Sequence, residues 1–126
     1  MNVVEFEKQL EEAHDLMVKE NYKEAVIILE KLKEIDKKSD FDYNLSHKLY
    51  QFLSNSKSLY NQQIILQNIK SLISNKKTID FAELNNIIRE TTELDIDDSI
   101  IQREVELLIL RNLLTCKIEG KTLVFE

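Results

Sequence analysis

The sequence is poor in the residues that form tight loops and cross-links: it has one glycine, one cysteine and no proline in 126 residues. Phosphate-binding loops need two or three glycines at fixed spacing, whereas Gly120 stands alone, so nucleotide-dependent enzymes are disfavoured. The single Cys116 cannot form an internal disulfide, which is typical of intracellular chains. We therefore expect a protein of the cytoplasm, the nucleus or both.

Long hydrophobic runs are absent and basic charge is scarce. No apolar run approaches the ~20 residues of a membrane span, and the first residues lack the pattern of a signal peptide, so no membrane association is expected. Lys and Arg total 17 against 23 Asp and Glu, which gives a net charge of −6. An acidic chain repels nucleic acid at long range, which makes nucleic-acid binding the weaker alternative.

Catalytic and metal-binding patterns are also missing. His14 and His47 each lack a second ligand at metal-binding spacing, and no base is placed to activate Cys116. The acidic run over 90–98 lacks the glycine and the final glutamate of a calcium loop. We predict no metal, no cofactor and no enzymatic activity; the acidic run is interpreted as helix capping, with a charged docking loop left open.

The first 37 residues predict a hairpin of two amphipathic helices. Apolar residues recur every three or four positions from Val3 to Met17 and again from Tyr22 to Ile35, with a short interruption at Glu20-Asn21. The segment 20–25 resembles the turn of a tetratricopeptide repeat, with Glu20 where that family usually has glycine. The resemblance implies a tetratricopeptide-like helical stack.

The middle of the chain predicts two more helices. A third helix is expected from the apolar spacing over 41–53, and a fourth over 59–73, because Ser54-Asn55-Ser56-Lys57-Ser58 breaks the pattern. The polar residues 74–77 are expected to end the fourth helix. We predict one domain of helical hairpins over 1–74.

Residues 75–126 predict a strand, two helices and a terminal β-hairpin, which is the order of a winged helix. The strand is expected at 78–81, and Asp80 with Glu83, like Ser99 with Gln102, has the spacing of a capping box at a helix start. The second helix is expected to continue through Leu114. Glu119-Gly120 is predicted as the two-residue hairpin turn. The expected fold is mainly α, with the two domains packed as one continuous unit.

This arrangement resembles the PCI family, the scaffold subunits of the proteasome lid, the signalosome and the third translation initiation factor complex. The segment 104–114 resembles the family's long winged-helix helix, while 116–119 and 122–125 resemble its wing strands. The resemblance implies a non-catalytic subunit that binds other PCI-type or helical-repeat proteins.

Two surfaces are predicted to bind those partners. The last strand is interpreted as a sheet edge that a partner strand can extend, and the uncapped helical end is interpreted as a contact face. The edge candidates are Lys121, Thr122, Leu123, Val124 and Phe125; the helical-end candidates are Val3, Val4, Phe6 and Tyr22. Self-association through the edge stays open. The alternative nucleic-acid surface would use Gln102, Arg103, Lys117 and Lys121. A peptide-gripping tetratricopeptide adaptor is a weaker third alternative.

Overall fold

The computed structural model describes all residues 1–126 as five helices and three short strands, with two compact units. The first unit is Met1–Tyr60 and the second is Asn61–Glu126. The mainly helical composition with a small C-terminal sheet confirms the coarse fold prediction. The division lies inside a helix, whereas the sequence placed it between residues 74 and 75; tight packing of the two units stays a prediction.

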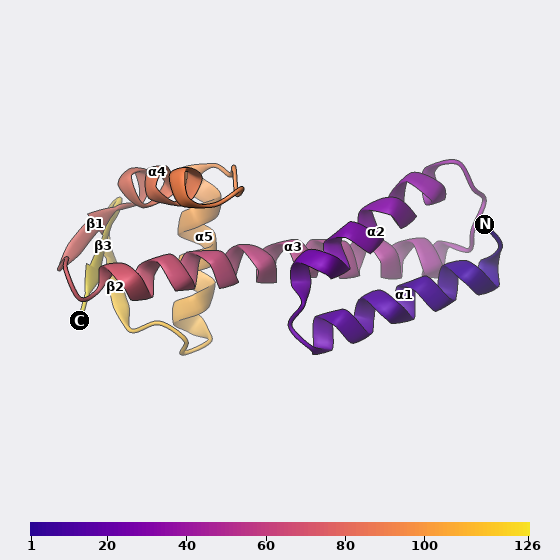
Figure 1. The fold of residues 1–126 in the computed structure, drawn as a ribbon, viewed down its shortest axis with the longest axis horizontal. Coiled ribbons are helices and arrows are strands. Elements are labelled where there is room, and N and C mark those ends of the chain that lie inside the picture. The colour runs from indigo at the N-terminus through magenta and orange to yellow at the C-terminus, as the bar shows by residue number, and fades with distance from the viewer. The chain divides into compact units, whose positions relative to one another are not determined.

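The first unit contains α1 (Val3–Val18), α2 (Tyr22–Lys37) and the N-terminal part of α3 (Tyr43–Leu72). α2 runs back alongside α1 (Figure 1), as the apolar spacing predicts. Their inward faces and α3 form one hydrophobic core of fully or almost fully buried residues. These are Phe6, Leu10, Ala13, Ala25, Leu29, Leu32, Leu49 and Leu53.

The turn between α1 and α2 places a non-glycine residue in the left-handed region. Glu20 has φ 62°, the conformation that favours glycine. The Asn21 N–H donates to the Leu16 carbonyl at 2.8 Å, and the Glu20 N–H donates to the Met17 carbonyl at 3.0 Å. These two bonds are those of a Schellman helix ending. Glu20 therefore adopts a backbone conformation that glycine adopts at lower cost.

α3 is one continuous helix, so the predicted break at 54–58 is wrong. Serine and asparagine are moderate helix formers, and without glycine or proline they do not stop a helix that is held by packing. Ser56, in the middle of the predicted break, is fully buried, and Lys57 lies 2.6 Å from Glu30 of α2. Tertiary contacts thus hold the segment helical.

The second unit combines the remainder of α3 with β1 (Thr78–Asp80), α4 (Phe81–Thr91), α5 (Asp98–Leu110), β2 (Cys116–Glu119) and β3 (Thr122–Phe125). The element order agrees with the sequence prediction. Buried apolar residues come from every one of these elements: Ile65, Ile69, Ile79, Leu84, Ile88, Ile101, Val105, Leu108 and Leu123 are at most 2% exposed, and Cys116 of β2 is 8% exposed.

The predicted capping boxes and the end of α5 are wrong. Asp80 and Asp97 occupy the N-cap positions without a side-chain cap bond; the Asp80 carboxylate instead accepts a hydrogen bond from the Thr122 hydroxyl at 2.8 Å. α5 ends at Leu110 rather than Leu114, because Asn112 has φ 60° and turns the chain out of the helix.

The three strands form an antiparallel sheet in the order β1-β3-β2. β3 is therefore the central strand, and the prediction that the last strand is a sheet edge is wrong. Glu119 lies opposite Thr122, so the two hairpin residues are Gly120-Lys121, one position later than predicted. Gly120 has φ 62°, the positive value that a hairpin turn with glycine at its first position requires.

Candidate protein-interaction surfaces

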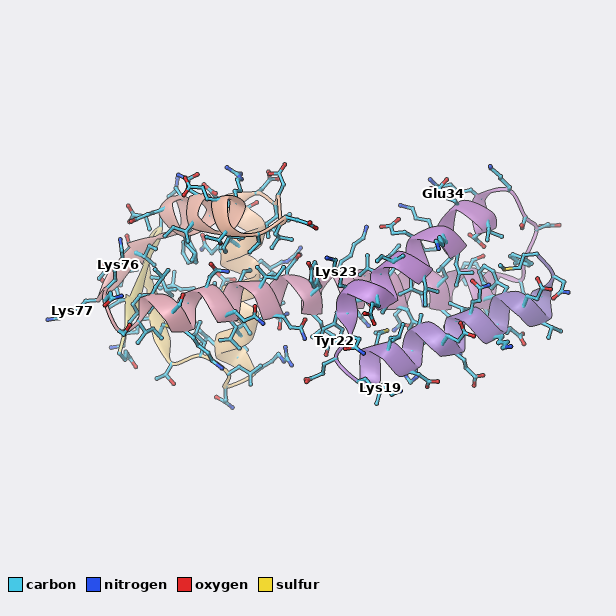
Figure 2. The ribbon with its side chains drawn as sticks, viewed as in Figure 1. Lys19, Tyr22, Lys23, Glu34, Lys76 and Lys77 are labelled. Atoms are coloured by element: carbon cyan, nitrogen blue, oxygen red, sulfur yellow. The ribbon has the colours of Figure 1, made fainter.

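The predicted helical end is only partly a surface. Val3 and Val4 are 46% and 74% exposed, whereas Phe6 is fully buried and Tyr22, at the start of α2 (Figure 2), is 9% exposed. Phe6 and Tyr22 thus lie in the core of the first unit and offer little or no surface to a partner. Val4 borders a hollow of about 420 Å³ between α1 and α3, together with charged residues of both signs: Glu7, Lys8, Glu11 and Lys48.

The predicted strand residues are divided between core and surface because β3 is central. Leu123 is fully buried and lies opposite both Ile79 and Ile118. Val124 and Phe125 are half-buried, and only Lys121, in the hairpin turn, is well exposed. The backbone of β3 is used on both sides, so β3 has no free edge for a partner strand.

The bonds that β3 makes toward β1 show which backbone groups of the sheet are used. The Phe125 N–H donates to the Lys77 carbonyl at 2.9 Å, and the Phe81 N–H donates to the Lys121 carbonyl at 3.0 Å. Backbone groups of alternate residues in an antiparallel strand point to opposite neighbours. The odd-numbered residues from 121 to 125 therefore bond toward β1, and the even-numbered residues of β3 bond toward β2.

β2 consequently has a hydrogen-bonding edge with no strand beside it. Lys117 and Glu119 lie opposite the even-numbered residues of β3, so their backbone groups are used inside the sheet. The N–H and C=O groups of Cys116 and Ile118 point the other way, where the sheet ends. We call the outward side of Cys116–Glu119 the β2 edge. Sequence reasoning missed it because strand order is not encoded in the alternation of apolar residues.

Two exposed leucines precede the β2 edge in the chain. Leu110, the last residue of α5, is 76% exposed, and Leu113 is 45% exposed. Between them, the Arg111 guanidinium donates a hydrogen bond to the side-chain oxygen of Gln62 in α3. The sequence signal was present: the segment 107–114 carries five leucines around Arg111 and Asn112, more than one helix face can bury.

The alternative nucleic-acid residues lie close to carboxylates. The Arg103 Nε is 3.6 Å from Glu104, Lys117 is 3.4 Å from Glu126, and the Gln102 amide donates to Glu106 at 3.3 Å. Lys121 borders a hollow of about 450 Å³ that also contains Asp80 and Asp98. Phosphate would meet negative charge beside each of these groups, so the arrangement does not favour a nucleic-acid surface.

The remaining chemistry-bearing residues have structural contacts. The His14 ring stacks on Phe52 at 5.2 Å between centroids, and the His47 ring stacks on Tyr43 at 5.9 Å. Burial, with a smaller effect of Glu126, raises the pKa of the Cys116 thiol and so opposes formation of the nucleophilic thiolate. No group of three or more His, Cys, Asp or Glu side chains is arranged to hold a metal ion.

Part of the acidic run holds the loop between α4 and α5. The fully buried Asn85 donates through its amide nitrogen to the Ile96 carbonyl at 2.8 Å and to the Asp98 carboxylate at 2.6 Å. Arg89 lies 3.4 Å from Asp95. At least two of the acidic residues therefore bind other parts of the chain. Asp97 and Asp98 lie at the N-terminus of α5, where the helix-capping interpretation puts acidic residues, but Asp97 makes no side-chain cap bond.

None of the helices is both long and apolar enough to cross a membrane. No known protein family, curated protein or solved structure matches the chain.

Proposed function

We propose that this chain is a non-catalytic interaction subunit of a multiprotein complex, located in the cytoplasm, the nucleus or both. In this proposal the first unit is a tetratricopeptide-like helical stack and the second is a winged helix, as in PCI-type scaffold subunits. The strand-helix-helix-hairpin order and the sheet order β1-β3-β2 support the winged-helix part. The Schellman turn at Glu20 supports the repeat-like part.

The observation that carries the proposal is the unpaired β2 edge. Backbone N–H and C=O groups at a sheet edge can be extended by a strand of a partner, which supplies affinity through main-chain hydrogen bonds. The exposed Leu110 and Leu113 add apolar surface to the same unit. Val3 and Val4 offer a second, smaller apolar contact on the first unit.

A proline scan of β2 tests the proposal because neighbouring positions have different roles. The Ile118 N–H points outward, so Ile118→Pro removes one donor of the β2 edge and spares the ladder to β3. The Lys117 N–H bonds inside the sheet, so Lys117→Pro breaks the ladder and reports what sheet damage alone does. Circular dichroism separates the folded variant from the damaged one.

The readout is a tagged pull-down of the full chain from its native cell, with mass spectrometry of the captured proteins. We expect helical-repeat or PCI-type subunits in fixed ratio with the wild type, and at least a tenfold loss of them with folded Ile118→Pro. Equal capture by the wild type and the folded variant would refute the β2 edge as the binding surface. Nuclease-sensitive capture that Arg103→Glu abolishes would instead establish nucleic-acid binding.

A further inference from the structure

The β2 edge carries a charge pattern that complements itself. Lys117 and Glu119 both lie exposed on one face of the strand, two positions apart and on either side of Ile118. We propose that the β2 edge binds the β2 edge of a second copy of this chain, antiparallel and about a two-fold axis at Ile118. The inference rests on the proposed function, since it names the occupant of the same edge.

The register follows from pleat and charge together. Residues directly opposite each other in an antiparallel pair share a face, so only partners of equal parity can be opposite. Centring the pair on Ile118 puts Lys117 opposite Glu119 of the second copy, and the two-fold axis repeats this pair. Centring it on Lys117 or on Glu119 puts like charges opposite each other, which is destabilising.

The backbone satisfies the same register. The N–H and C=O of Ile118 point out of the sheet, so the two Ile118 residues at the axis can exchange both hydrogen bonds. Lys117 and Glu119 then form non-hydrogen-bonded pairs, in which opposing side chains lie closer together. Gly120 falls opposite Cys116 of the second copy and has open space where a Cβ would stand, so no side chain obstructs the end of the pairing.

The expected dimer is weak and depends on concentration. A pair of four-residue strands buries far less than the ~1,200 Å² of a stable interface. Within one chain Lys117 lies 3.4 Å from Glu126, with side chains 70% and 41% exposed. Such exposed ion pairs are weak, so Lys117 can exchange Glu126 for Glu119 of the second copy. The competing explanation is that Lys117 protects the edge from pairing, as edge lysines often do.

Charge-swap variants of the full chain, measured by analytical ultracentrifugation over a concentration series, test the register. We expect the wild type to show a monomer–dimer equilibrium, and Lys117→Glu and Glu119→Lys each to weaken it at least tenfold. An equimolar mixture of the two variants restores dimers, because positions 117 and 119 then carry opposite charges across the axis in both pairs of the mixed dimer. The double variant Lys117→Glu/Glu119→Lys also restores them. Lys121→Glu has the same net charge as Lys117→Glu but lies outside the register, so it dimerises like the wild type.

The outcomes separate this inference from the proposed function. A wild type that stays monomeric at every concentration, or a mixture that does not restore dimers, overturns the self-pairing. If the chain is monomeric and folded Ile118→Pro still loses its captured proteins, the β2 edge binds a different partner and the proposed function stands. If the chain dimerises as described but captures no other protein, self-pairing stands and the role as a complex subunit falls.

Discussion

Replacing Glu20 by glycine should stabilise the first unit. Glu20 has φ 62° in the turn between α1 and α2, a conformation that costs an ordinary L-residue about 1–2 kcal/mol and glycine almost nothing. Glycine also makes the unfolded chain more flexible, which lowers the free energy of unfolding by about 0.4–1 kcal/mol. The net expectation for Glu20→Gly is an increase of about 1 kcal/mol in the free energy of unfolding.

Glu20→Ala is the matched control because it removes the same side chain, with its contacts, and keeps the positive φ. Its free energy of unfolding should lie close to that of the wild type or below it. Urea unfolding followed by circular dichroism measures the difference between the two variants, and a gain of about 1 kcal/mol corresponds to roughly 4 °C in Tm for a chain of this length. If glycine is no more stable than alanine at this position, Glu20 is not strained and the explanation of the turn is refuted.

Three further predictions concern buried polar groups. Ser56 is fully buried in α3 and its hydroxyl has no hydrogen-bond partner, so Ser56→Ala should raise the free energy of unfolding by about 1 kcal/mol. The control Ser54→Ala, at an exposed position of the same helix, should change the free energy of unfolding by less, and urea unfolding measures both values. Asn85→Asp replaces the amide nitrogen, which donates to the Ile96 carbonyl and the Asp98 carboxylate, by an oxygen. The free energy of unfolding should fall by about 3 kcal/mol or more in the same assay. Because the pKa of Cys116 is raised, iodoacetamide should alkylate the folded chain much more slowly than the unfolded chain at pH 8. Glu126→Gln should speed the alkylation, since it removes the negative charge that helps to raise this pKa. Equal alkylation rates in the folded and unfolded protein would contradict the prediction.

The raised thiol pKa also fixes the sign of one pH effect. The folded chain holds the Cys116 proton to higher pH than the unfolded chain does, so the unfolded state releases it first as pH rises. Cys116 therefore leaves the free energy of unfolding unchanged at pH values below the ordinary thiol pKa, and it lowers the free energy of unfolding as the pH rises above that value. Comparing the wild type with Cys116→Ser between neutral and alkaline pH isolates the effect.

The helices that the sequence predicted correctly are those whose burial follows a single period. α1 and α2 each bury residues three or four positions apart, and every fully buried residue of α1 lies on the predicted face. α3 lacked such a signal because its two parts belong to different units and bury different faces. The apparent break at 54–58 was a change of buried face within one helix.

Helix ends were predicted less well because local caps compete with tertiary hydrogen bonds. Asp80 has the residue type of an N-cap, but its carboxylate accepts from Thr122, which is far away in the sequence. Glu83, its expected capping partner, lies 2.6 Å from Lys76 instead. A capping pattern in the sequence cannot show that the capping side chain will form a hydrogen bond with a residue of another strand instead.

The position of the interaction surface depended on strand order, which the sequence does not determine locally. The sequence predicted a hairpin at the end of the chain, and the structure has one with its turn one position later than predicted. The sequence did not show that β1 would pair with β3 and leave β2 outside, because α4 and α5 separate β1 from the hairpin in the sequence. The same hairpin with β1 on its other side would expose β3 and hide the Lys117 and Glu119 register. Which surface this chain offers to a partner therefore depends on the pairing of β1 with β3, and a variant that unpairs β1 should expose β3 as a second free edge while the β2 edge stays free.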